Sequence, residues 1–353
     1  MSDSNFVIPE PILDKKEENS LIILTDKYEK MLEPTRISKA GQKIKGLIPE
    51  KAVATVNGAK EALTERELFI KAMEIVMEGF KFVEKTAAKY SLSRKSIVEK
   101  VNRIVPDNEI STIEEICFAR GYDIAKIVDN DSLINTGFAA LEGGITGAFG
   151  FPGLPFNLVL SIFLYYRAVQ SVAMFYGYDV KDDPAELEIA GEVFMNALSP
   201  SSNNINEMSS IIGKVMIMTE TTAIKQTVKK GWQAMAERGG AALLIVQMRA
   251  LANKSAQKAL EKAGAKGFEE TMFQNVFEQV GKKLTKKVVG KSIPIVGGVI
   301  GALFDTAQMR KIVDYANIFY NKRFVMDKEM RINDIMGMED GIVYFEDIKT
   351  VEE

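Results

Sequence analysis

Two acidic side chains are the candidate catalytic groups of this sequence. Glu142 directly precedes an uncharged run of 24 residues, and Asp305 directly follows a second uncharged run of 13 residues. If the two runs pack together, these carboxylates approach each other or the guanidinium groups of Arg167 and Arg323, the candidate ion-pair partners. A pair of carboxylates can carry out acid/base hydrolysis. The simpler interpretation, which we favour, is that each acid caps a helix or forms a structural ion pair.

The rest of the composition narrows the chemistry further. The chain of 353 residues contains no histidine and a single cysteine, Cys117, which we expect to be buried. Ser-His-Asp and Cys-His sites, histidine-bearing zinc sites and an internal disulfide are therefore excluded. Gly290-Lys291-Ser292 lacks the first glycine of a phosphate-binding loop. We predict no metal and no cofactor, and we favour a protein without catalytic activity.

The elements that must position these groups are helical almost throughout. Apolar residues recur with a period close to 3.6 in several segments, which is typical of amphipathic helices. Asp183-Pro184 marks a helix start, because aspartate caps helices and proline fits their first turn. We expect helices at 63–90, 112–128, 183–198, 243–260, 268–289 and 305–324. The fold class is therefore predicted to be all-α, with Gly341–Ile348 as the one strand-like run.

Composition divides the chain into three parts. We expect residues 1–45 to form a polar N-terminal arm, either with a short helix near 20–32 or as a disordered leader. Their acidic and proline residues do not fit a secretory signal peptide. Residues 46–325 are expected to form one helical domain. Residues 326–353 hold nine acidic and three basic residues, and we expect them to form an acidic C-terminal tail.

The two uncharged runs depart from the amphipathic pattern. The first, Gly143–Tyr166, is long enough to span a membrane, but Pro152 and Gly153 interrupt it, so a helical hairpin fits better. The second, Ser292–Phe304, is too short to span. Glycines four residues apart in both runs allow close helix packing, either in a bilayer or in a protein core. The glycine-rich hairpin residues are Gly143, Gly147, Gly150, Gly153, Asn157, Gly297, Gly298 and Gly301.

The two hairpins also align with each other. Gly150, Gly153 and Asn157 have the same spacing as Gly298, Gly301 and Asp305. A helix bearing aromatic residues follows each set. We interpret the match as a candidate internal repeat, in which two hairpins face each other around a pseudo-twofold axis.

Two groups of residues resemble the signatures of the EcsC family. The central signature is carried by Glu142-Gly143-Gly144, Thr146-Gly147, Gly150, Gly153 and Tyr176-Gly177-Tyr178-Asp179. The C-terminal signature is carried by Ile293-Pro294, Gly297-Gly298, Gly301, Asp305, Ala316 and Arg323. The sequence departs from the family pattern at Asn157, where that pattern has an acidic residue, and at Asp305, where it often has an asparagine. The resemblance covers roughly residues 60–325, and it implies a bacterial accessory role in membrane transport or secretion rather than a reaction.

Charge is unevenly distributed along the chain. The net charge is −3, yet residues 214–291 hold 15 basic and 6 acidic residues. The densest lysines lie just before the second uncharged run: Lys282, Lys283, Lys286, Lys287 and Lys291. A basic stretch beside an apolar hairpin suits an anionic membrane surface, whereas a solvated helix face is the plainer alternative. Nucleic acid is a poor partner, because the stretch has few aromatic residues and no known motif.

These features lead to one expectation and two alternatives. We expect a non-catalytic accessory protein, cytoplasmic and peripheral at the inner face of the cell membrane. It would bind an anionic lipid surface or a membrane protein through the hairpins and the basic region. The alternatives are a carboxylate-dependent hydrolase that uses Glu142 and Asp305, and a soluble helical scaffold whose apolar hairpins are core.

Overall fold

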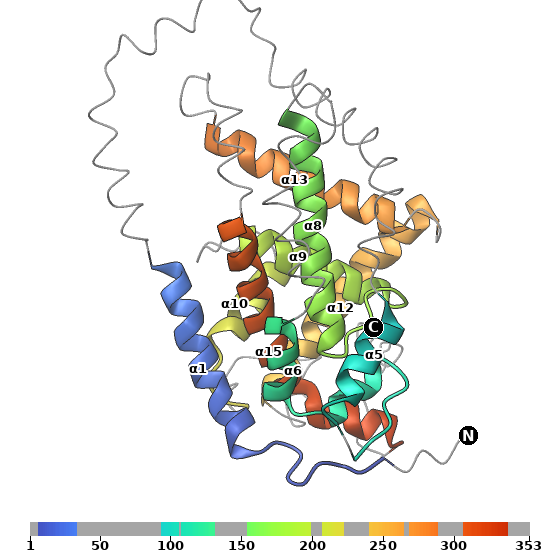
Figure 1. Cartoon of the computed structure of the whole chain (residues 1–353). Helices are drawn as coiled ribbons and strands as arrows, with labels where there is room; N and C mark the ends of the chain where they lie inside the picture. Colours follow the sequence, from blue (N-terminus) through green and yellow to red (C-terminus); the bar gives the residue numbers. More distant parts are fainter. Residues whose placement is uncertain are drawn as a thin grey trace, which may run out of the picture.

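The described part of the chain is built from helices alone. The computed structural model describes residues 6–33, 93–105, 107–130, 154–198, 207–221, 240–264, 268–288 and 306–337. Within these ranges every regular element is a helix, so the prediction of an all-α fold is confirmed (Figure 1). The expected helix at 63–90 and the strand-like run Gly341–Ile348 lie outside the described residues.

The longest described helix, α15 (Thr306–Ile335), lies among most of the others. It has 30 residues, which corresponds to a length of about 45 Å. From Tyr315 to Lys328 nearly every side chain is buried, so this part of the helix must have neighbours around its whole circumference. Those neighbours are α1 (Lys15–Leu32), the 3-10 helix η2 (Glu114–Phe118), α6 (Gly121–Asn130), α8 (Leu154–Phe175), α9 (Pro184–Leu198), α10 (Glu207–Ile217) and α12 (Gly240–Ala263).

A glycine makes the tight turn between α8 and α9. Gly177 has a φ of 85°, in the left-handed region that residues with a Cβ rarely adopt. The N–H of Tyr178 donates a hydrogen bond to the carbonyl of Ala173 (3.1 Å), a pattern that ends many helices at such a glycine. The turn points Tyr178 back toward the centre of the helical body, where it is buried.

Three helices lie close to where the sequence predicted them. α9 begins at Pro184, and Asp183 caps it by accepting a hydrogen bond from the N–H of Ala185 (2.9 Å). α12 extends the predicted helix 243–260 at both ends. α13 (Phe268–Val288) is one residue shorter than predicted. None of the helices in the described ranges has both the length and the apolar character needed to cross a membrane.

The helix expected at 112–128 is instead two elements. η2 ends at Phe118, the extended backbone of Ala119 (φ −76°, ψ 170°) interrupts the helix, and α6 begins at Gly121. The N–H of Gly121 donates to Glu17 (2.9 Å), and a Cβ at this position would lie 3.2 Å from the ring of Phe324. The prediction of one helix was wrong because two tertiary contacts, one with α1 and one with α15, set where α6 begins.

Both ends of the described chain belong to the helical body. α1 lies within the segment predicted as a polar arm, yet its Leu21, Leu24 and Tyr28 are buried. α15 continues to Ile335, inside the segment predicted as an acidic tail, and Ile332 is fully buried there. The structure therefore differs from the boundaries at 45 and 326, because composition does not report which polar segments have a buried face.

Glu17 joins α1 to two other helices. Its buried carboxylate accepts hydrogen bonds from Nζ of Lys328 (2.8 Å), Nη1 of Arg120 (2.9 Å) and the N–H of Gly121 (2.9 Å). A buried carboxylate is costly unless donors replace the water that it loses. These three donors connect α1 with the start of α6 and with α15.

We predict that Glu17→Gln lowers the free energy of unfolding by about 3 kcal/mol, because the buried ammonium of Lys328 loses its counter-charge. Urea unfolding of the full chain, followed by circular dichroism, measures this change. Glu18→Gln, at the exposed neighbouring position of α1, is the matched control and should change it by less than about 0.5 kcal/mol. Equal losses in the two variants would contradict the role given to Glu17.

Candidate functional site

The middle of α15 carries a fully buried ion pair. The guanidinium of Arg323 lies against the carboxylate of Glu186 on α9, with Nη1–Oε2 and Nη2–Oε1 distances of 2.6 and 2.7 Å. Their exposed fractions are 1% and 2%. Two parallel hydrogen bonds between charged groups give the strongest and most directional contact available to these side chains. The pair therefore fixes the start of α9 against α15.

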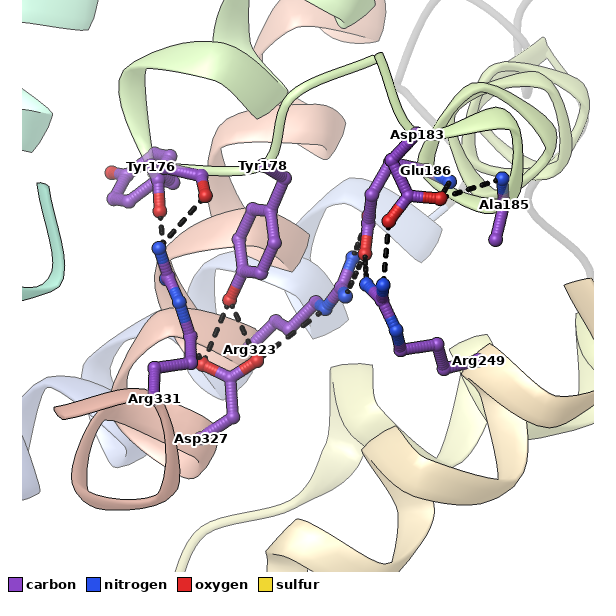
Figure 2. Close-up of polar contacts among 10 residues, drawn as sticks. Tyr176, Tyr178, Asp183, Ala185, Glu186, Arg249, Arg323, Asp327 and Arg331 are labelled. Carbon is purple, nitrogen blue, oxygen red and sulfur yellow. Dashed lines mark hydrogen bonds and ion pairs between the residues drawn. The ribbon is translucent and has the colours of Figure 1, made fainter. Parts of the chain in front are cut away.

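A second arginine reaches the same carboxylate from α12. Nη1 of Arg249 donates to Oε1 of Glu186 (2.6 Å), and its Nη2 donates to Oδ2 of Asp183 (2.5 Å). Figure 2 shows Arg249 and Arg323 approaching Glu186 from different helices. The capping residue and the first turn of α9 are thus bound by two other helices.

Tyr178 attaches the turn after α8 to the same network. Its hydroxyl donates to the carboxylate of Asp327, with oxygen–oxygen distances of 2.9 and 3.0 Å. The guanidinium carbons of Arg323 and Arg331 lie 3.8 and 4.6 Å from its ring centroid, and the ring lies between the two arginines (Figure 2). Each contact of this kind is a cation–π interaction.

Arg331 binds the carbonyls at the end of α8. Its guanidinium donates to the backbone oxygens of Tyr176 (3.0 Å) and Gly177 (2.8 Å). A cation is favourable here, because helix C-termini present partial negative charge. A Cβ at Gly177 would lie 2.2 Å from Nη2 of Arg331. Gly177 is therefore required both by its backbone conformation and by the closeness of this arginine.

Burial and neighbouring charges act in opposite directions on the acids of the network. For Glu186, burial favours the neutral acid, but the charges of Arg323 and Arg249 prevail and lower its pKa. For Asp327, burial raises the pKa in spite of the nearby arginines. Burial also raises the pKa of Tyr178 well above its ordinary value.

This network has the chemistry of a structural centre. Among the described residues, the buried side-chain atoms without a hydrogen-bond partner are Tyr320 Oη and Arg323 Nε, and the latter lies 3.7 Å from Asp327. Glu186 and Asp327 are held by arginines or by a tyrosine and are buried, whereas Asp183 and Arg249 are partly exposed. A reacting group needs access to a substrate. The arrangement instead joins α8, α9, α12 and α15 at one place.

A buried lysine lies next to this network on α15. Nζ of Lys322 donates to Oγ1 of Thr25 on α1 and to the carbonyl of Met216 on α10, the latter at 2.7 Å. Neither partner is charged. Burial lowers the pKa of Lys322 to about 7, although Glu29 acts in the opposite direction. The ammonium form is therefore the costly one in the folded chain.

Most of the site residues proposed from the sequence cannot be located in the structure. Those outside the described residues are Glu142, Asp305, Gly143, Gly147, Gly150, Gly153, Gly297, Gly298, Gly301 and Lys291. Asn157 lies in the first turn of α8. Four lysines lie in the last two turns of α13: Lys282, Lys283, Lys286 and Lys287. The internal repeat and the carboxylate pair therefore stay predictions.

The two arginines proposed from the sequence have acidic partners that the sequence did not indicate. Arg323 pairs with Glu186, and Arg167 pairs with Glu269 on α13. Nothing in the sequence around Glu186 or Arg249 indicates a buried ion pair, because a charged residue in a helix has the same local pattern whether it is buried or exposed. The one available signal was the resemblance itself, since Tyr178 and Arg323 belong to its two signatures.

We predict that Glu186→Gln lowers the free energy of unfolding by about 3 kcal/mol, because Arg323 loses its closest counter-charge and keeps only Asp327 at 3.7 Å, while Arg249 keeps Asp183. Asp182→Asn is the control, since it removes an exposed ion pair with Arg94 and should cost less than about 1 kcal/mol. Chemical unfolding curves of both variants measure the difference. An equally small effect of both variants would contradict the stabilising role that we give to the Glu186–Arg323 pair.

Lys322 gives a prediction for pH dependence. Its folded pKa is about 7 and its ordinary value 10.5, so between these values the unfolded chain holds a proton that the folded chain has lost. Folding is then increasingly favoured as pH rises above about 7, with a slope of at most about 1.4 kcal/mol per pH unit. We expect Lys322→Met to remove this rise when unfolding free energies are compared at pH 7 and pH 9.

The control for Lys322→Met is Lys311→Met, at an exposed position of the same helix. Subtracting the unfolding free energy of each variant from that of the parent chain at the same pH separates the contribution of Lys322 from that of other titrating groups. A parent chain and a Lys322→Met variant with parallel pH profiles would disprove the role of this lysine.

Comparison with known proteins identifies the family. No curated protein and no solved structure matches the chain. Residues 24–325 of the 353 match the EcsC protein family. The matched stretch includes α8, α9, α12 and the first part of α15, with Tyr178, Glu186 and Arg323. Because the match covers most of its length, the chain belongs to the EcsC protein family.

Proposed function

We propose that this EcsC-family chain is a non-catalytic interaction protein that binds an anionic membrane surface peripherally, from the cytoplasmic side. The observation that carries the proposal is the crossing of α8 and α13. It brings an uncharged helix end and a lysine-rich helix end to the same part of the molecule.

The crossing is defined by two contacts. The rings of Phe163 and Phe273 pack edge to face with centroids 5.7 Å apart, and Arg167 forms an ion pair with Glu269. The N-terminal part of α8, residues 154–166, contains no charged residue. Figure 1 shows this end of α8 extending past α13 at the upper end of the molecule. An uncharged helix end at the periphery suits contact with an apolar or interfacial medium.

Beyond the crossing, α13 ends in a dense group of lysines. Lys282, Lys283, Lys286 and Lys287 fall within six consecutive residues of α13. Each lysine near an anionic bilayer contributes about 1 kcal/mol to binding. Four of them together are enough to hold a protein reversibly at such a surface, with further help from apolar contact.

The sequence beside both helix ends agrees with this proposal. The uncharged run 143–166 continues into α8, and the uncharged run 292–304 follows α13 by a few residues. The two glycine-rich runs are thus connected directly to the two helix ends in the sequence. The described buried network is engaged in holding helices together, which supports a role in binding rather than catalysis.

Vesicle co-flotation tests the proposal. We predict that the full chain floats with vesicles of phosphatidylglycerol and phosphatidylcholine, and much less with phosphatidylcholine alone. Replacing Lys282, Lys283, Lys286 and Lys287 by glutamate should weaken binding by about a thousandfold, because roughly 4 kcal/mol of attraction is lost. Raising the salt concentration should also weaken it, because salt screens exposed charges.

A second quadruple reversal on α1 is the matched control. Lys15, Lys16, Lys27 and Lys30 are exposed there, and their replacement by glutamate changes the net charge equally. This control should retain most of the binding. Absence of flotation, or equal losses in the two variants, would overturn the lipid-surface proposal. Binding to native membranes but not to protein-free vesicles would point to a membrane protein as partner.

A further inference from the structure

A polar cleft lies between α9, α12 and α13, apart from the buried network and from the lysine-rich end of α13. It has a volume of about 380 Å³, within the range of small-molecule sites. Three helices contribute its walls, and its lining carries both acidic and basic side chains.

The wall formed by α9 is acidic. Glu188 and Glu192 both line the cleft and lie four residues apart, on one face of the helix. Ser255 of α12 donates a hydrogen bond to Glu188 (2.6 Å), and Ser209 of α10 donates one to Glu192 (3.0 Å). These hydroxyls fix the positions of the two carboxylates. Burial, together with the charge of Glu192, raises the pKa of Glu188, so a bound cation would relieve an existing cost.

The wall formed by α12 is basic. Lys258 and Lys262 line the cleft four residues apart, and both are exposed. α13 contributes one further carboxylate, Glu278. The acidic and basic groups therefore lie on different helices. A simple anion would meet carboxylates, and a simple cation would meet lysines, whereas a molecule with both charges would satisfy both walls.

Between the charged walls, Gly191, Met272 and Val276 form an apolar part of the lining, beside the polar side chains of Thr271, Asn275 and Gln279. A Cβ at Gly191 would lie 3.4 Å from Val276 and 3.7 Å from the hydroxyl of Tyr166, in ordinary van der Waals contact. The absence of a side chain at 191 therefore leaves space that a methyl group would fill. A short hydrocarbon linker between two charged groups fits such a lining.

We propose that this cleft binds a small zwitterion, in which a short chain joins an ammonium group to a carboxylate or phosphate. The ammonium lies against Glu188 and Glu192, and the anionic group lies between Lys258 and Lys262. This site is independent of membrane binding by α8 and α13. Its chemistry is shared by free amino-acid-like compounds and by the ethanolamine headgroup of lipids.

Isothermal titration calorimetry of the full chain tests the proposal. The probes are O-phosphoethanolamine and 4-aminobutyrate, which carry the two kinds of anionic group. Ethanolamine and inorganic phosphate each supply one charge only. We expect saturable binding of at least one zwitterion, about tenfold or more tighter than either single-charge probe. No saturable binding of either zwitterion at millimolar concentration, or equal binding of the single-charge probes, would overturn the proposal.

Substitutions in the two charged walls test whether the zwitterion binds in this cleft. Glu188→Gln keeps an acceptor for Ser255 but removes the charge, and Lys258→Gln with Lys262→Gln changes only exposed side chains. Each should weaken zwitterion binding by about tenfold or more. Lys254→Gln and Glu261→Gln, exposed on α12 outside the cleft, are matched controls and should leave binding unchanged. Binding that survives both wall variants would place the ligand elsewhere and overturn the assignment.

Vesicles distinguish the two sources of the zwitterion. The quadruple α13 lysine variant is mixed with phosphatidylcholine vesicles that contain or lack phosphatidylethanolamine. Flotation that needs both phosphatidylethanolamine and Glu188 assigns the cleft to a lipid headgroup. Binding of the soluble probes without such flotation assigns it to a free zwitterion. Because anionic lipid is absent, this arm does not depend on the proposed electrostatic membrane contact.

Discussion

The buried ion pair between Arg323 and Glu186 is the interaction on which the described structure most depends. Withdrawing two charges from water costs several kcal/mol for each ion, and only close, well-directed contacts offset that cost. The two hydrogen bonds of 2.6 and 2.7 Å meet this condition. Because they form in one relative placement of α9 and α15, they disfavour other placements that would bury similar apolar area. Arg249 and Tyr178 then fix α12 and the turn after α8 to the same place.

The same principle repeats along α15. Lys322 reaches toward α1 and α10, Arg323 toward α9, and Lys328 toward Glu17 of α1. A central helix with only apolar side chains could rotate or slide among its neighbours, because hydrophobic contact has little direction. Charged groups that need particular partners remove that freedom. We infer that these buried cations set the rotation and register of α15, while the surrounding aromatic and aliphatic residues supply most of the burial.

The charged residues that hold the helices together are distinct from those to which we assign a binding role. The buried arginines and lysines are bound by carboxylates, hydroxyls and carbonyls inside the fold. The two binding places that we propose lie elsewhere: the ends of α8 and α13, and the cleft lined by Glu188 and Lys258. The central network holds α8, α9 and α12, which each carry part of one of these places, in a fixed relation to one another.

Local sequence determined the helical class, the start of α9 and the extents of α12 and α13, because periodicity, caps and prolines act between residues a few positions apart. The family signatures also singled out Tyr178 and Arg323 before their surroundings were known. Only the tertiary structure decided the partner of Arg323, which lies 137 residues away in Glu186. It likewise decided the break before Gly121 and the burial of α1 and the end of α15 in segments that looked like polar tails. A buried ion pair depends on how distant helices pack, and no spacing within either helix records which opposite charge it will meet.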